Sequence, residues 1–151
     1  MLALTILLKF DNVAEFEAFL ESAYSYMELV EVTYNESQNV HSTELNFHIP
    51  WTLTEFNADI NSNLETDASD YELVDVSSYL TGFSSLYGWK QTSYYSNIYE
   101  SDSDEVFITI KGVHSFGITV GENGLDYSKS VIIVVNVNRK TGKLISYGWT
   151  N

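Results

Sequence analysis

Four segments in the first half of the chain have the pattern of apolar and polar positions that is typical of strands. Leu29–Tyr34 and Val40–His48 alternate and are rich in β-branched and aromatic residues, and Tyr71–Val76 has the same character. Leu2–Phe10 is short and almost continuously apolar, so it is interpreted as a strand and not as a signal peptide. These segments predict a sheet with one buried face.

Two further segments space their apolar residues three and four apart, which predicts helices. Asn12 and Glu15 form a capping-box pattern at the start of the first helix, and Thr52 and Glu55 form the same pattern at the start of the second. Acidic residues fall on the opposite face of each helix. The apolar positions are Val13, Phe16, Phe19, Leu20, Ala23 and Met27 in the first helix and Leu53, Phe56, Ile60 and Leu64 in the second.

The order over residues 2–76 is therefore β-α-β-β-α-β, which is the order of a ferredoxin-like unit. We expect an α+β protein with a mostly antiparallel sheet, in which residues 1–151 form a single domain or two subdomains that divide at residue 76. Ser77–Trp89 is interpreted as a short helix or a connecting loop. The predicted C-terminal strands are Gln91–Tyr99, Val106–Val113 with Phe116–Val120 (two strands or one bent strand), and a hairpin of Ser130–Val137 with Leu144–Trp149.

The charge is distributed very unevenly along this sequence. Residues 10–89 contain 15 Asp and Glu and no Lys or Arg, in a chain of 151 residues whose net charge is −14. Disordered acidic chains usually have few aromatic residues, whereas 15% of this chain is aromatic, so we expect a folded protein. The absence of Cys excludes disulfides and thiol chemistry and fits the cytoplasm.

The acidic stretch predicts a surface that binds a basic protein and repels nucleic acid and anionic membranes. Carboxylates on the two predicted helices and on acidic loops would pair with Lys or Arg of the partner, and aromatic rings near the middle of the chain would act as anchors. The candidate partner-binding residues are Glu15, Glu17, Glu21, Glu55, Asp59, Asp67, Asp70, Asp102, Asp104, Glu105, Tyr79, Tyr87 and Trp89.

In size, acidity, lack of Cys and abundance of Tyr, Asn and Ser, the chain resembles the small acidic inhibitors that phages encode. These include nucleic-acid mimics that act on restriction enzymes and anti-CRISPR proteins that act on Cas nucleases. The resemblance implies an inhibitor that occupies the basic nucleic-acid groove of such a nuclease in the cytoplasm of the host cell. By the same features the chain also resembles immunity proteins, which neutralise basic nuclease toxins.

An enzymatic alternative depends on the sequence His41-Ser-Thr43, followed later by His114-Ser-Phe116. Two His-x-Thr/Ser elements on strands resemble the motif of two-histidine phosphoesterases, which act on cyclic and 2′,5′-linked phosphates. The resemblance implies that His41 and His114 are acid and base and that Thr43 binds the phosphate. The second element departs from the motif, because Phe116 replaces the hydroxyl. The sequence shows no pattern for a metal or a cofactor, and we expect neither.

Two further alternatives concern assembly. The chain would be a structural subunit of a phage or cell assembly if its acidity serves to keep the monomer soluble. The predicted turn at Asn138–Lys143 carries Arg139, Lys140 and Lys143, which are three of the seven bases of the chain. Contact between this basic turn and the acidic surface of a second copy would produce a homo-oligomer.

Overall fold

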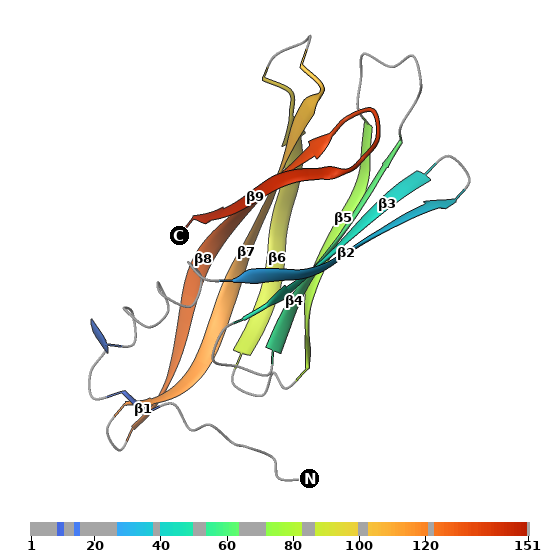
Figure 1. The fold of residues 1–151 in the computed structure, drawn as a ribbon. Helices are drawn as coiled ribbons and strands as arrows, with labels where there is room; N and C mark the ends of the chain where they lie inside the picture. Colours follow the sequence, from blue (N-terminus) through green and yellow to red (C-terminus); the bar gives the residue numbers. More distant parts are fainter. Residues whose placement is uncertain are drawn as a thin grey trace.

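The computed structural model describes residues 9–10, 14–15, 27–37, 40–49, 54–63, 72–82, 87–99, 103–120 and 123–150. Nine strands form in this part of the chain, and they build two sheets that lie face to face (Figure 1). Their bounds are β1 Lys9–Phe10, β2 Glu28–Ser37, β3 Val40–His48, β4 Thr54–Asn63, β5 Glu72–Gly82, β6 Tyr87–Asn97, β7 Glu105–Val120, β8 Asn123–Asn138 and β9 Leu144–Thr150.

The two sheets follow the order of the chain. The first sheet is an antiparallel meander with the strand order β2-β3-β4-β5. In the second sheet β6, β7, β8 and β9 pair antiparallel with their sequence neighbours, and β1 adds to the far end of β7 in parallel through Lys9 and Phe10. Apart from the two-residue strand β1, the chain therefore completes the first sheet before it begins the second, and it passes from one sheet to the other between β5 and β6.

The core lies between the two sheets, and strict alternation along the strands builds it. Every second residue of β4 is buried, and Phe56, Ala58 and Ile60 are at most 2% exposed. From the second sheet, Ile110 and Ile133 are fully buried against this face. Each Ile or Phe buried in this way contributes roughly 1.5–3 kcal/mol of hydrophobic free energy. Side chains of the residues between them point to the two outer faces.

The expected α+β class is wrong, because the described residues form sheets and include no helical element. The second predicted helix is strand β4. The spacing of four between Phe56 and Ile60 fits one face of a helix, but it also fits one face of a strand, and Ala58 completes the strand pattern between them. The first predicted helix lies mostly outside the described residues. The ferredoxin-like order is therefore also wrong, because β3, β4 and β5 are consecutive antiparallel strands.

Several strand predictions are confirmed. The alternation of Val40–His48 gives β3 with the predicted bounds, and the C-terminal hairpin pairs β8 with β9. The segments on both sides of residue 115 form one strand, β7. The stretch Ser77–Trp89 is extended where it is described, since β5 continues to Gly82 and β6 begins at Tyr87. Within the described residues, no helix has the length and apolar character needed to cross a membrane.

Candidate functional site

The outer face of the first sheet carries carboxylates and amides from all four strands. Register fixes which residues lie there, because paired residues of neighbouring strands share a face. On β3 and β4 the buried residues alternate with the outward ones, and Glu44 is exposed while Glu55 and Asp59 are half-buried. We call this surface the acidic face, defined by Glu31 on β2, Glu44 on β3, Glu55 and Asp59 on β4, and Asp75 on β5.

Two of these carboxylates lie directly opposite each other. Glu44 and Asp59 are paired in the register of β3 and β4. Like charges at paired positions of an antiparallel sheet destabilise it. The first sheet supplies no Lys or Arg that could pair with these carboxylates, since residues 10–89 contain neither. The acidic face therefore places two carboxylates at one register position, where a cationic group from outside the chain could contact both.

Tyr79 on β5 completes this part of the acidic face. Its side chain is 45% exposed and hydrogen-bonds with Asp59. The negative charge of Asp59 raises the pKa of Tyr79, and burial, the hydrogen bond and Glu44 raise it further. Burial raises the pKa of Asp59 above its ordinary value of 3.8, while the hydrogen bond with Tyr79 offsets part of that shift. Burial thus makes Asp59 a weaker acid than a solvent-exposed aspartate.

An amide network supports the same surface. The Nδ2 group of Asn46 donates to Glu55 Oε2 at 3.0 Å and to Asn57 Oδ1 at 2.7 Å, and Asn57 Nδ2 donates to Thr81 Oγ1 at 2.8 Å. Above this network lies a hollow of about 350 Å³. Its lining comes from β2 to β5 and consists of Val30, Glu31, Thr33, Glu44, Leu45, Asn46, Glu55, Asn57, Asp59 and Tyr79. The hollow is lined by the carboxylates of Glu31, Glu44, Glu55 and Asp59 and bordered by an exposed apolar side chain, Val30.

The structure brings together three of the predicted partner-binding residues. Glu55, Asp59 and Tyr79 share the acidic face, although the first two lie on a strand and not on the predicted helix. Trp89 is partly buried between the sheets, where its ring packs edge-on against Phe56 at 5.0 Å between ring centroids. Tyr87 belongs to β6, and its side chain lies outside the described part.

The other predicted acids do not join this surface. Asp104 lies just before β7 and forms an ion pair with Lys140 at 3.0 Å, and Glu105 begins that strand. Glu15 is exposed and lies on neither sheet. The remaining candidates, Glu17, Glu21, Asp67, Asp70 and Asp102, lie outside the described residues.

Comparison with known proteins gives no relatives. No protein-family model matches the chain, and no match was found among curated proteins or solved structures. Any inference about function therefore depends on the geometry of the surface itself.

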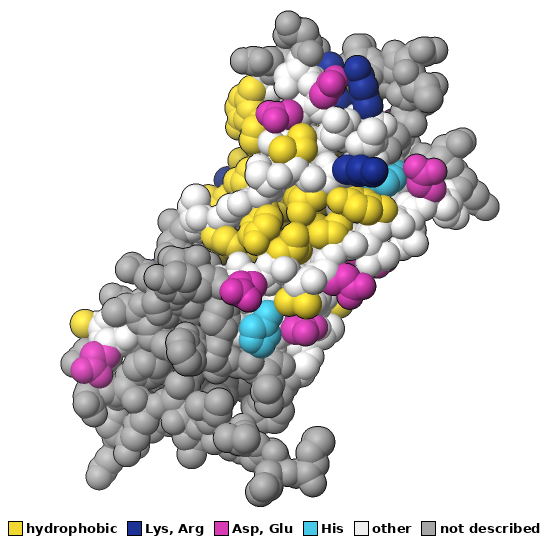
Figure 2. Space-filling view, viewed as in Figure 1, with side chains coloured by type: hydrophobic (Ala, Val, Ile, Leu, Met, Phe, Trp, Pro, Cys, Tyr) yellow, Lys and Arg dark blue, Asp and Glu magenta, His cyan; other side chains and the backbone are white. Residues whose placement is uncertain are grey.

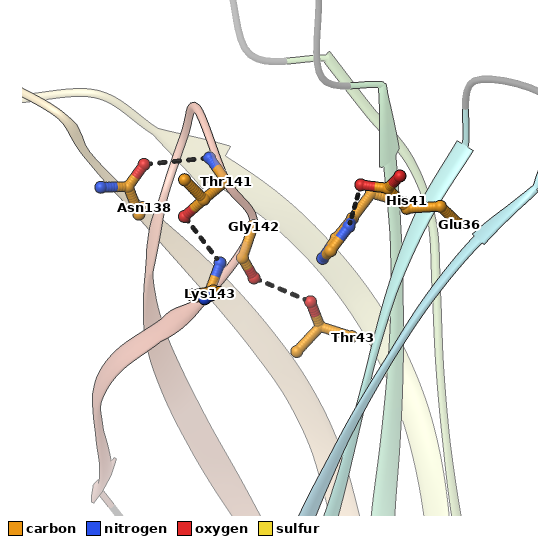
Figure 3. Close-up of polar contacts among 7 residues, drawn as sticks. All are labelled: Glu36, His41, Thr43, Asn138, Thr141, Gly142 and Lys143. Carbon is orange, nitrogen blue, oxygen red and sulfur yellow. Dashed lines mark hydrogen bonds and ion pairs between the residues drawn. The ribbon is translucent and has the colours of Figure 1, made fainter.

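The three residues of the enzymatic alternative do not form one site. His41 and Thr43 lie near the turn between β8 and β9, where Thr43 Oγ1 donates to the Gly142 carbonyl at 2.9 Å and the His41 ring contacts Gly142 (Figure 3). Glu36 Oε1 lies 3.6 Å from His41 Nδ1. All these groups lie near the end of β7 that contains Glu105. Glu105 pairs with Asn138, and the turn between β8 and β9 begins at Asn138.

His114 lies much farther along β7. Nine residues separate it from Glu105, which is a distance of about 30 Å at roughly 3.3 Å per residue. Its ring is 2% exposed and lies 6.4 Å from the ring of Trp89, and burial lowers its pKa from 6.5 to about 3. His114 and His41 are therefore core residues in separate places. Among the described residues, no group of three His, Asp or Glu side chains is arranged to hold a metal ion.

Sequence reasoning missed three members of the acidic face, which are Glu31, Glu44 and Asp75. The alternation of Val40–His48 contains a signal for Glu44, because it places this residue opposite the buried face of β3. No such signal exists for its position beside Asp59, since that neighbour depends on how β3 and β4 pair.

Proposed function

We propose that this protein is a binding protein that docks a basic surface of a protein partner on its acidic face. The observation that supports this most directly is the opposed pair Glu44 and Asp59, held beside Tyr79 on a sheet face without Lys or Arg. Such a pair costs stability in the isolated chain. A Lys or Arg of the partner, placed between the two carboxylates, would be attracted to both and would offset their mutual repulsion.

The surface supplies both kinds of contact that protein interfaces need. Hydrogen bonds between a cationic donor and a carboxylate contribute about 1.5–3 kcal/mol each when they are shielded from water. Tyr79 offers an exposed ring at the edge of the hollow, and Tyr is among the residues that most often dominate binding energy. The summed negative potential of the chain also speeds the approach of a basic partner in a salt-dependent way.

The expected inhibitor of a nucleic-acid-handling protein is one specific form of this proposal. A basic groove that binds phosphates has the charge that the acidic face would complement. DNA competes with the protein for the partner if the docked surface is such a groove. DNA has no effect if the docked surface is another basic patch, so competition separates these two kinds of partner.

Neutralising the opposed carboxylates tests the proposal. The double variant Glu44→Gln, Asp59→Asn keeps the shapes of both side chains, and we expect it to fold with equal or greater stability because the repulsion is gone. The matched control is Asp104→Asn, Glu105→Gln, which removes the same charge outside the acidic face, at the start of β7 in the second sheet. The probe is a fluorescently labelled octalysine peptide, titrated at several salt concentrations.

The expected result is at least a tenfold loss of affinity for octalysine in the acidic-face variant, which is about 1.4 kcal/mol, and less than a threefold loss in the control. Equal losses in the two variants would show that only net charge attracts the peptide. That outcome contradicts a docking surface at this site.

A further inference from the structure

The two sides on which the sheets meet are closed in different ways. On the β5–β6 side, the side chain of Gln91 donates to the Val76 carbonyl at 2.7 Å and accepts from Ser78, which in turn accepts from the Trp89 indole at 2.8 Å. The chain itself also crosses between the sheets there. This side is therefore held by a hydrogen-bonded network.

On the opposite side, the edge strands β2 and β9 face each other, and two tyrosine hydroxyls link them. The hydroxyl of Tyr147 on β9 accepts from the Leu29 amide at 3.4 Å, and the hydroxyl of Tyr34 on β2 accepts from the Leu144 amide at 3.0 Å. Figure 2 shows hydrophobic side chains gathered over the region where β2 and β9 lie in Figure 1, with carboxylates beside them. Tyr34, Ile145 and Tyr147 are 38–48% exposed there.

Strand β2 pairs with β3 only, so its other edge has no neighbouring strand within the described residues. From Glu31 to Ser37 its register with β3 is regular, and the single bulge lies before this stretch, between Leu29 and Glu31. Edge strands are usually protected by Lys, Pro or bulges. Glu31–Ser37 contains none of these, and it leaves backbone donors and acceptors facing outward on alternate residues.

We propose that this edge of β2 binds an extended basic segment of the partner as an additional strand. The inference rests on the proposed function, because it takes the partner to be basic, and it specifies the form in which part of that partner binds. Backbone hydrogen bonds along Glu31–Ser37 would hold the segment, as in other cases of strand addition.

The two faces beside β2 determine which sequence the segment needs. Glu31, Thr33 and Asn35 point to the acidic face, next to Glu44, so every second residue of the segment should be Lys or Arg. The intervening residues would point toward the apolar region formed with β9, so they should be apolar. The partner segment is therefore an alternating basic and apolar strand.

Charge also decides against a second copy of this chain as the occupant. Antiparallel pairing of two β2 strands would place Glu28, Glu31 and Glu36 of both copies close together, and like charges across a strand pair are unfavourable. The same glutamates favour a basic strand. The glutamates of β2 therefore disfavour pairing with a second copy of this chain and favour pairing with a basic strand.

Three synthetic peptides test the proposal with the unaltered protein. The first is Lys-Val-Lys-Val-Lys-Val-Lys with blocked ends. The second is the same peptide N-methylated at each internal residue, which removes backbone donors but keeps the charge. The third is Lys-Lys-Lys-Lys-Val-Val-Val, which has the same composition without alternation. Affinities come from fluorescence titration, and the exchange of each backbone amide is followed by NMR.

We expect the alternating peptide to bind at least tenfold more tightly than either control, and to slow amide exchange within Glu31–Ser37 at least tenfold. Amides of β5, the other edge of the first sheet, provide the internal comparison and should not change. Equal affinity for the three peptides without protection of β2 would overturn strand addition and leave docking on the acidic face intact. Absence of binding by all three would overturn strand addition as well, and the octalysine titration then decides separately whether the proposed function also fails.

Discussion

Replacing His114 with Gln should remove part of the acid sensitivity of the fold. The imidazole is buried against Trp89, and burial lowers its pKa to about 3 from an ordinary value of 6.5. The unfolded chain therefore binds more protons than the folded chain between these two values. It follows that the stabilising contribution of the neutral ring is fully present above about pH 6.5 and is lost progressively as the pH falls toward about 3.

The size of the effect follows from the two pKa values. Between pH 7.5 and pH 5.5, the unfolded state gains about 1.4 kcal/mol from protonation of this histidine, while the folded state gains almost nothing. For a denaturant slope of about 2 kcal/mol per molar urea, the midpoint of unfolding falls by about 0.7 M over this range because of His114 alone. Other groups titrate in the same range, so only the difference between wild type and variant isolates this contribution.

Urea unfolding followed by tryptophan fluorescence measures this difference. Trp89 and Trp149 both pack against Phe56, so their emission reports the loss of the core. Midpoints are compared at pH 7.5 and pH 5.5 at constant ionic strength for wild type, His114→Gln and His114→Leu. Both variants should lose less stability than wild type on acidification, by the same 0.7 M. Parallel pH dependence of all three proteins would refute the placement of a neutral, buried histidine at this position.

Three further substitutions test the turn between β8 and β9. Gly142→Ala should destabilise the protein by about 2 kcal/mol or more, because φ is 72° there and an added Cβ would collide with the His41 ring, whereas Gly148→Ala, with open space around its Cβ, should change the melting temperature by less than about 2 °C. Thr43→Val should cost about 1–3 kcal/mol in urea unfolding by leaving the buried Gly142 carbonyl without its donor, and Thr43→Ser should restore most of it. Lys140→Ala should change stability by at most about 1 kcal/mol, since its ion pair is exposed, and a larger loss in thermal unfolding would show that the pair holds the turn.

The elements that the sequence could identify are those with only one periodic interpretation. In β3, polar residues separate every pair of buried ones, so alternation predicts the strand and its bounds. In β4, Phe56 and Ile60 fit both a helix and a strand, and the capping pattern before them favoured the wrong choice. Thr54 and Ala58 are small but buried because β3 and β5 flank β4. No local sequence pattern reveals that β4 lies between two strands.

The candidate site was partly predictable for a related reason. Residues four apart share a face in both a helix and a strand, so Glu55 and Asp59 were placed outward correctly although their element was wrong. Glu44 and Tyr79 join them only because β3 and β5 flank β4. That proximity is a property of strand pairing, and it appears in the sequence only when the sheet order is known.

The separation of the two sheets along the chain has a consequence for its synthesis. All strands of the first sheet precede β6 to β9, and Phe47 of β3 packs against the rings of Tyr147 and Trp149 of β9, at 5.1 and 5.2 Å between ring centroids. At roughly 5–20 residues per second, the ribosome needs about 3–13 s to proceed from Gly82 to Trp149. During that interval the apolar face of the meander lacks the cover that β9 provides. Neighbouring nascent chains carry the same negative charge over residues 10–89, so their mutual repulsion would keep these uncovered faces apart until β9 arrives.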